Sequence, residues 1–236
     1  MDDGPVTYKL ENNVAVIQLD DGKANAVGYA MINGLTAALD QSEKDNAGAV
    51  LLIGRPGKFS AGFDLNEMAK GKSNAQALCA AGAKMTTRLY LHPRPVVMAC
   101  TGHALAAGGV FLLAGDYRIG ITGKFKLGFN EIAIGLPAPF FLTALMEQRM
   151  ASHYFTRSAL LSEIFTPEVA VEAGLIDEVV EPEKIIEAAT AKAEQLCQLP
   201  SPVFGDAKKK KRSAIVKEIL DTLEADLADF ELPTPD

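Results

Sequence analysis

The sequence predicts an α/β fold, because short apolar segments alternate with amphipathic helical segments over about its first 130 residues. Two of the short segments, GAVLLIG at residues 48–54 and VVMACT at residues 96–101, contain no charged residue, as is typical of strands that a parallel sheet buries on both faces. After Pro139 the pattern changes, and we expect helices alone. The prediction is therefore an α/β core that continues into a helical region.

The first elements can be placed in order along the chain. Residues 8–20 (YKLENNVAVIQLD) predict a hairpin of two strands with its turn at residues 11–13. A helix is expected from residue 29 to residue 45, because its apolar residues fall on one stripe. A single Ala-rich helix is expected to follow KFSAGFDL and to run to Leu91, where Pro93 and its neighbours end it.

Two more strands and four helices complete the predicted chain. The strands are expected in DYRIGIT and KFKLGF, and we interpret Asp116 and Arg118 in the first of these as structural polar groups that pair with each other. Pro200 and Pro202 predict a linker before the last helix. The predicted helices span residues 140–149, 167–173, 182–199 and 207–230. This pattern divides the chain into residues 1–199, a core that runs into a helical region, and residues 200–236, a C-terminal helical tail.

Composition and charge argue against several classes of function. The chain has 236 residues, of which 48% are hydrophobic and 22% charged, as expected of a globular protein. Its net charge of -7 disfavours nucleic-acid binding, which depends on neutralising phosphates. Residues 96–115 carry no charge and could span a bilayer, but glycines, Thr101 and His103 interrupt them. We interpret them as a buried strand followed by a buried helix, not as a membrane span.

The cysteines, the histidines and the start of the chain suggest neither export nor a metal site. Cys79, Cys100 and Cys197 are widely spaced and odd in number, which favours a reducing, cytoplasmic setting. The first residues are acidic and lack the pattern of a signal peptide. The three histidines have no ligand spacing, so we expect no metal and interpret His103 as structural.

Two loops place small residues where a strand is expected to end and a helix to begin. They are FSAGFDL at residues 59–65 and TGHALAAGGV at residues 101–110. Backbone N–H groups at such a junction are unpaired and can bind an anionic oxygen, although close packing of strand on helix is an alternative reason for small residues. Neither loop matches GxxxxGK[ST] or GxGxxG, so nucleotide hydrolysis is not indicated.

Glu131 is the candidate catalytic residue. It stands in KLGFNEIAIGL, an apolar segment with no basic residue within four positions on either side. Burial raises the pKa of a carboxyl group towards neutrality, where the group can both accept and return a proton.

The chain resembles the crotonase superfamily, which includes the enoyl-CoA hydratases and isomerases, over most of its length. The motifs that carry the resemblance occur in family order: DDGKANAV, GKFSAGFDLNEM, RPVVMACTGHALAAGG with GDYRIG, NEIAIGL, and TPEVAVEAGLIDEVV. The resemblance implies a ββα spiral core with a C-terminal helical region used in trimer assembly. It also implies an acyl-CoA thioester as the substrate, with no separate cofactor.

The resemblance further implies roles for residues that match the family motifs. The backbone N–H groups of Phe63 and Ala107 would bind the thioester oxygen as it becomes an enolate, although many relatives have Gly at the second position. Glu131 would be the base. The backbone around four residues in and just before the first loop would hold the adenine and the bent CoA chain: Lys58, Ala61, Asp64 and Leu65. Further substrate contacts are expected at Gly108, Val110 and Phe140.

The missing second carboxylate favours one reaction of the superfamily. Hydratases of the superfamily carry another glutamate shortly after the Gly-rich loop, where this chain has Val110. With a single glutamate at the site, the chain resembles the isomerases that move a double bond from position 3 to position 2 of an enoyl-CoA. A 2-enoyl-CoA hydratase and a non-catalytic acyl-CoA binder remain as alternatives, and RNA binding, found in a few relatives, is disfavoured by the acidic charge.

Three further expectations concern the surroundings of the site. Val110, Phe111, Phe140 and Phe141 are candidates for an apolar wall that excludes water, with core packing as the alternative. The basic run Lys208 to Arg212 is interpreted as a solvated helix face, with contact to the CoA phosphates as the alternative. A homotrimer or a dimer of trimers is expected.

Overall fold

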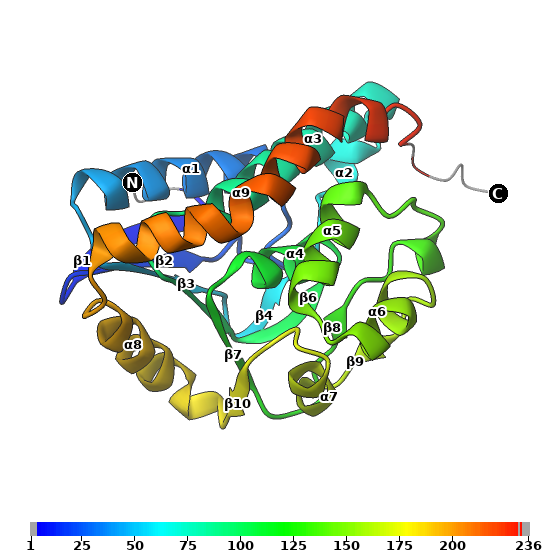
Figure 1. Cartoon of the computed structure of the whole chain (residues 1–236). Coiled ribbons are helices and arrows are strands. Elements are labelled where there is room, and N and C mark those ends of the chain that lie inside the picture. Colours follow the sequence, from blue (N-terminus) through cyan, green and yellow to red (C-terminus); the bar gives the residue numbers. More distant parts are fainter. Residues whose placement is uncertain (1–3, 231, 233–236) are drawn as a thin grey trace.

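The computed structural model describes residues 4–230 and residue 232, and it consists of β-strands and helices in alternation (Figure 1). The strands are β1 (Val6–Glu11), β2 (Val14–Leu19), β3 (Ala49–Ile53), β4 (Gly57–Ser60), β5 (Val96–Cys100), β6 (Gly102–Leu105), β7 (Tyr117–Ile121), β8 (Leu127–Gly128), β9 (Ile164–Phe165) and β10 (Glu178–Val180). The α-helices are α1 (Tyr29–Lys44), α2 (Leu65–Met68), α3 (Lys72–Tyr90), α4 (Ala107–Ala114), α5 (Phe140–Arg149), α6 (Ser152–Ala159), α7 (Pro167–Glu172), α8 (Ile185–Leu196) and α9 (Ser201–Asp226). Two short 3-10 helices, η1 (Ile132–Ile134) and η2 (Pro182–Lys184), complete the list.

The strands form two sheets through a repeated ββα unit. One sheet has six strands in the order β1-β2-β3-β5-β7-β10, and the other has four in the order β4-β6-β8-β9. In each unit the first strand (β3, β5 or β7) joins the six-stranded sheet and the second (β4, β6 or β8) joins the four-stranded sheet, before the chain turns into a helix. This is the ββα spiral that the resemblance implies.

Glycine allows the two sheets to meet closely at the start of β6. Only Thr101 separates β5 from β6, so the chain passes from one sheet to the other within a single residue. Gly102 pairs with Gly57 of β4, and a Cβ atom at Gly102 would lie only 2.0 Å from the carbonyl carbon of Gly57. A side chain at Gly102 would therefore push the two strands apart.

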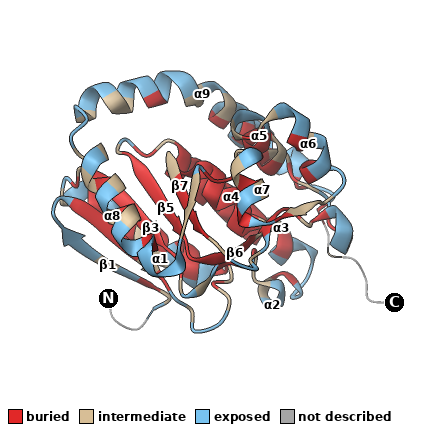
Figure 2. Cartoon of the chain, turned by 90° about the horizontal axis from the view of Figure 1, so that it is seen from below, coloured by how far each residue is buried: buried red, intermediate tan, exposed pale blue. Residues whose placement is uncertain are grey.

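The strands of the six-stranded sheet are buried on both faces, as predicted. In β3, Val50 and Leu52 belong to the apolar cluster on the side of α1, α3 and α4, whereas Leu51 belongs to a second cluster that Ile185 of α8 and its neighbours cover. Figure 2 shows the central strands and α4 as the most buried parts of the chain. The predicted hairpin, the first helix and the strands β3, β5, β7 and β8 are confirmed, whereas β4 and β6 were not predicted and lie partly or wholly in segments expected to be loops.

The Ala-rich segment after β4 forms two helices instead of the single one predicted. Asp64 caps the first, α2, with its Oδ1 atom accepting a hydrogen bond from the N–H of Asn66 at 2.9 Å. Gly71, at φ 136°, separates α2 from α3 in a backbone conformation that residues with a side chain rarely adopt.

The prediction for the chain after Pro139, which had helices alone, four of them, with a linker before the last, is wrong in three respects. Strand β9 pairs with β8, and β10 pairs with β7, so this half of the chain extends both sheets. Helix α6 was not predicted. Helix α9 starts at Ser201, so Pro202 lies in its first turn and not in a linker, because the missing N–H of proline has no intrahelical partner there.

Asp116 and Arg118 are structural, but they do not pair with each other. Asp116 lies 2.6 Å from Nζ of Lys208 and 2.9 Å from Nη1 of Arg212, and both of these residues belong to α9. Arg118 instead pairs with Asp177 at 2.7 Å. Lys208 is 6% exposed, so only residues 209–211 of the basic run fit the predicted solvated face.

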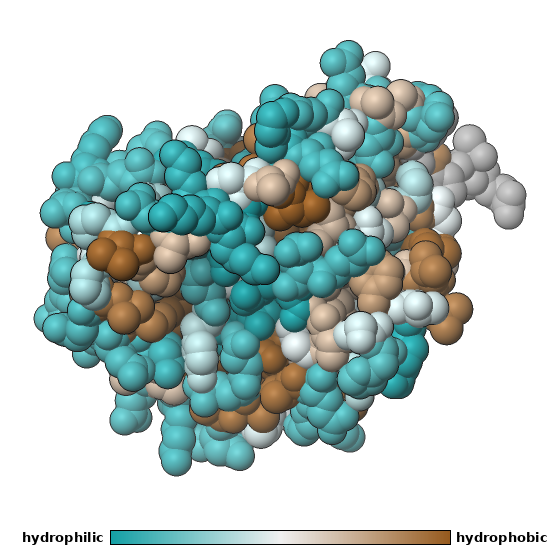
Figure 3. Space-filling view, in the orientation of Figure 1, coloured by the Kyte–Doolittle hydropathy of each residue, from teal (hydrophilic) through white to brown (hydrophobic). Residues whose placement is uncertain are grey.

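The surface of the molecule is mainly hydrophilic on the face shown in Figure 3, where hydrophobic residues form small separate groups. Within the part of the chain that the structure describes, no helix is both long and apolar enough to cross a bilayer.

Candidate active site

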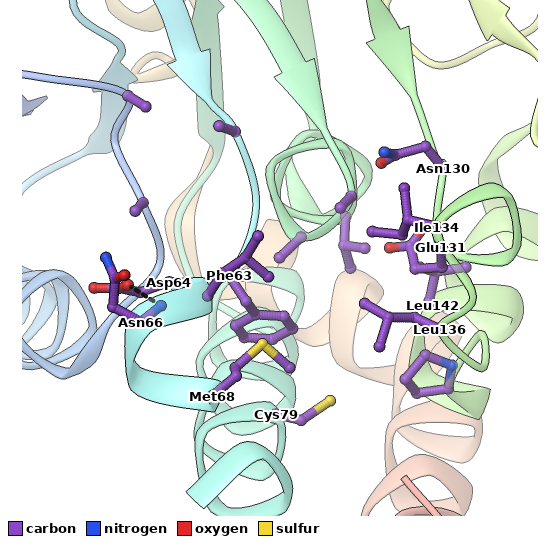
Figure 4. A pocket seen from close by; sticks show the side chains of 18 of the residues that line it. Phe63, Asp64, Asn66, Met68, Cys79, Asn130, Glu131, Ile134, Leu136 and Leu142 are labelled. Atoms are coloured by element: carbon purple, nitrogen blue, oxygen red, sulfur yellow. Dashed lines mark hydrogen bonds between the residues drawn. The ribbon is translucent and has the colours of Figure 1, made fainter. Parts of the chain in front are cut away.

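A cavity of about 660 Å³ lies where the β2–α1 loop, the first helical turns after β4 and β6, and the segment after β8 come together (Figure 4). Its polar and charged lining residues include Asp21, Lys23, Asp64 and Asn66, and Asn130 and Glu131 lie across the cavity from Asp64 and Asn66. The apolar lining residues include Met68, Cys79, Val110, Leu136, Phe141, Leu142 and Phe230. A site of this size and composition suits a small molecule that has both polar and apolar parts.

Two backbone N–H groups at the cavity have no acceptor among the described residues. Phe63 forms a parallel bridge with Val27. In this bridge the N–H of Val27 donates to Gly62 O at 2.8 Å, and the N–H of Asp64 donates to Val27 O at 3.2 Å. The N–H of Phe63 takes no part in the bridge and is directed away from Val27. Ala107 is the first residue of α4, where an N–H has no partner within the helix. Both groups can therefore donate to a ligand.

The two loops that carry these donors touch each other. A Cβ atom built on Gly62, at φ 99°, would lie 2.9 Å from Cβ of Ala106 and 3.5 Å from N of Ala107. Ala106 itself has φ 50° and ψ -125°, a strained conformation for a residue with a side chain, with a cost of about 1–3 kcal/mol. This conformation turns the chain from β6 into α4 and places the N–H of Ala107 at the cavity.

Glu131 lies at the N-terminal end of η1, across the cavity from Phe63 and close to Leu136 and Leu142 (Figure 4). It is 8% exposed, and its Oε2 atom has no hydrogen-bond partner among the described residues. Burial raises the pKa of its carboxyl group to about 7, although a hydrogen bond from its own backbone N–H opposes this. A carboxyl group with this pKa can accept a proton and return it near neutral pH.

The other carboxylates at the cavity are already engaged. Asp21 accepts hydrogen bonds from the N–H groups of Lys23, Asn25 and Ala26. Burial alone would raise the pKa of Asp21, but these bonds outweigh it and hold the pKa below its usual value. Asp64 caps α2. Of the carboxylates that line the described cavity, Glu131 alone is free to exchange a proton with a ligand.

The structure brings most of the predicted site residues to this cavity. Those that line it are Glu131, Phe63, Ala107, Ala61, Asp64, Leu65 and Val110. Lys58 is an exposed residue of β4 outside the lining, and Gly108 packs α4 on β4, since a Cβ there would lie 2.4 Å from Ser60 O. Phe140 also lies outside it: its N–H donates to Asp226 Oδ2 at 2.8 Å, and its neighbour Phe141 lines the cavity instead. Phe111 is buried in the core, which agrees with core packing, the alternative to a place in the apolar wall.

Several lining residues were not predicted. Asp21 and Lys23 lie within DDGKANAV, and Asn130 precedes Glu131, so the family motifs contained a signal for them. Cys79 and Phe230 had no local signal, because only tertiary packing brings α3 and the end of α9 to the site.

His103 lies on β6 outside the cavity. Its Nδ1 atom accepts a hydrogen bond from Lys126 N–H at 3.0 Å, and its ring contacts Phe125 edge-on, which fits the structural role predicted for it. The described residues contain no group of three or more His, Cys, Asp or Glu side chains that could hold a metal ion.

Comparisons with known proteins agree with this geometry. The family model for enoyl-CoA hydratase/isomerase matches residues 9–234. A crystal structure of an enoyl-CoA hydratase/isomerase family protein from Pseudomonas syringae superimposes with a TM-score of 0.93 at 38% sequence identity, covering 96% of this chain and 98% of that one.

Curated relatives carry both isomerase and hydratase names. The mitochondrial enoyl-CoA delta isomerase 1 of Homo sapiens is 30% identical over 222 residues, which cover 92% of this chain and 73% of the relative. A probable enoyl-CoA hydratase of Bacillus subtilis is 30% identical over 158 residues, which cover 66% of this chain and 59% of the relative. The fold, the cavity and the extent of these matches lead to one conclusion: the chain belongs to the enoyl-CoA hydratase/isomerase family of the crotonase superfamily.

Proposed function

We propose that the protein is an enoyl-CoA isomerase that moves a double bond from position 3 to position 2 of its substrate, with Glu131 as the proton carrier. The observation that carries the proposal is that the cavity holds one uncommitted carboxylate, while Val110, fully buried, stands where the hydratases of the family have their second glutamate. One carboxylate is sufficient for isomerisation, because the same group removes and returns the proton.

In the proposed reaction the thioester oxygen is held by the N–H groups of Phe63 and Ala107. The Glu131 carboxylate removes a proton from C2, and the electrons of the C–H bond move through C1 to the oxygen, which gives a dienolate. Removing one hydrogen-bond donor from such a site typically lowers the rate by about a hundred- to a thousand-fold. Protonated Glu131 then returns the proton to C4, the double bond forms between C2 and C3, and the carbonyl is restored.

The apolar walls support the proposal by limiting water. Val110, Phe141 and Leu142 are each no more than 2% exposed and line the cavity. A water molecule near C3 would contact Glu131 but no second carboxylate, so its addition to the double bond would lack one of the two groups that orient it.

Hydration is the second candidate function, because the Bacillus subtilis relative is named a probable enoyl-CoA hydratase. A non-catalytic acyl-CoA binder is the third, and the free Glu131 argues against it.

The experiment compares 3-hexenoyl-CoA conjugation with crotonyl-CoA hydration. We expect the wild type to isomerise at least about tenfold more efficiently than it hydrates, because loss of a positioned acid or base costs about a hundred- to ten-thousand-fold. Val110→Glu should narrow that gap, and Val110→Gln, which is similar in size but cannot ionise, should not. Glu131→Gln should abolish turnover and keep CoA-ester binding within a few-fold. A wild type that hydrates faster than it isomerises would contradict the proposal.

We also propose that the protein assembles as a homotrimer, or as a dimer of trimers. The support is a set of exposed apolar residues beside the site: Ile132 and Ile134, each 44% exposed, and Leu160 and Leu161, 56% and 70% exposed. A hydrogen bond from the N–H of Ala133 to Oγ of Ser162, 3.2 Å long, holds these two segments together. Apolar residues of this kind are commonly covered when subunits associate.

A further inference from the structure

We infer that Phe230, four residues beyond the end of α9, determines how long an acyl chain the cavity accepts. The inference rests on the proposed binding of an acyl-CoA, but not on which reaction follows. We call Leu227 to Phe230 the C-terminal wall.

The polarity of the cavity fixes the direction of the bound substrate. In Figure 4, Asp64 and Asn66 lie on one side of the cavity and Asn130 and Glu131 lie on the opposite side, with Phe63 between them. Met68 and Cys79 lie below Phe63 in this view, and α3, which carries Cys79, contacts α9. The charged and polar CoA moiety suits the side of Asp64 and Asn66, and Lys23 is also part of the lining. With the thioester oxygen at the two N–H donors, the acyl chain extends towards Cys79 and Phe230.

Phe230 closes this apolar end. It lines the cavity, is 4% exposed and belongs to the main apolar cluster together with Cys79 and Leu142. An aromatic ring in this place limits the length of the acyl chain, because a longer chain would collide with the ring. Met68, Phe141 and Leu142 of the same lining are apolar, so room made at the ring would be available to methylene groups.

Hydrogen bonds from two other elements hold the C-terminal wall in position. The side-chain amide of Gln76 in α3 donates to the carbonyl oxygens of Leu227 and Ala228, at 2.9 and 2.8 Å. Oδ2 of Asp226 accepts a hydrogen bond from the N–H of Phe140 at the start of α5, at 2.8 Å. These bonds use helix-end groups that have no partner within their own helices. The wall is therefore fixed to both helices that flank the apolar end.

The test measures binding of saturated acyl-CoA thioesters with 4, 8, 12 and 16 carbons by calorimetry, since these ligands are not turned over. Each methylene that enters the apolar end should raise the affinity about fourfold until the chain meets the wall. In Phe230→Ala the affinity should continue to rise for longer chains, so that the first chain excluded by the wild type binds at least about tenfold more tightly. Phe230→Leu should give a smaller change in the same direction.

Two further variants complete the design. Cys79→Val adds a methyl-sized group to the same end and should lower the affinity for the longest accepted chain more than it lowers the affinity for butanoyl-CoA. Leu220→Ala is the matched control, because Leu220 is a 42% exposed residue of α9 that does not line the cavity. If Phe230→Ala does not fold, Phe230→Leu and Cys79→Val decide the outcome.

The outcomes separate this inference from the proposed function. A chain-length limit that is the same in the wild type and in all folded variants overturns the role of Phe230 and leaves the acyl-CoA site intact. A wild type that binds none of the four thioesters overturns the acyl-CoA site, and the role of Phe230 with it.

Discussion

The carboxyl group of Glu131 is 8% exposed and lacks a partner for its Oε2 atom among the described residues, so its ionisation opposes folding. At a pH below 4.5, the ordinary pKa of a glutamate side chain, the carboxyl group is protonated in both the folded and the unfolded chain. It then does not lower the free energy of unfolding. As the pH rises to about 7, the unfolded chain releases the proton while the folded chain keeps it, so the free energy of unfolding falls. Above that pH the folded protein carries a penalty of about 3 kcal/mol.

Glu131→Gln should therefore be more stable than the wild type, and increasingly so as the pH rises. The amide fills the same space without ionising, so the stability difference should grow by about 2 kcal/mol between about pH 5.5 and about pH 8.5. Urea denaturation of both proteins across this range measures it. Parallel pH curves for the two proteins would mean that water solvates the ionised carboxylate in the folded state.

The residues of the site differ in how far the sequence could predict them. Glu131 was identifiable, because a lone carboxylate in an apolar segment needs a reason, and Ala107 followed from its place in a motif. Phe140 was predicted as a substrate contact, but the helix that starts there turns Phe141 to the cavity instead. Phe230 could not be predicted, because nothing in its local sequence relates it to a segment far away along the chain.

Helix α9 is joined to the six-stranded sheet by buried ions. Asp116, at the start of β7, accepts a hydrogen bond from Val96 N–H at 2.8 Å and pairs with Lys208 and Arg212, which lie one helical turn apart on the same face of α9. Burial lowers the pKa of Lys208 to about 8, although its pairing with Asp116 opposes this. The run Lys208 to Arg212 looked like a solvated face because sequence shows the spacing of charges and not which side of the helix is covered.

The three charged positions should respond differently to substitution. Asp116→Asn leaves Lys208 and Arg212 buried without their counter-ion and should lower the free energy of unfolding by about 3–5 kcal/mol. Lys208→Met removes a buried charge while Asp116 keeps Arg212, so the cost should be below about 1.5 kcal/mol. Lys211→Met, at an exposed position of the same run, is the control and should change stability by less than about 0.5 kcal/mol. Equal effects of all three in urea denaturation at neutral pH would show that the cluster does not anchor α9.

At the scale of the whole molecule, the alternation of strands and helices was predictable, whereas the two-sheet arrangement came only from the family resemblance. Strands β9 and β10 have two and three residues, too few for a hydrophobic period to show. Their pairing depends on contacts between segments far apart in sequence, which no local pattern encodes.

The proposed trimer predicts a mass of about three times 25.1 kDa, or a multiple of it, by light scattering at micromolar concentration. Leu160→Ser together with Leu161→Ser should weaken the assembly, because these exposed leucines would lose apolar area at the subunit contact. Leu10→Ser is the matched control, since this leucine of β1 is 45% exposed and distant from the site in sequence. A monomeric wild type would argue against assembly, and an unchanged mass in the double variant would place the contact elsewhere.

The cavity walls are drawn from almost the full length of the chain, from Asp21 to Phe230, and this affects when the site can form during synthesis. A ribosome adds about 5–20 residues per second and releases the N-terminal segments first, so the sheets can begin to assemble while α9 is still unmade. Until the codon for Phe230 has been read, the cavity lacks this part of its lining. A nascent chain can thus acquire its fold in stages, but its cavity is complete only after Phe230 has been added.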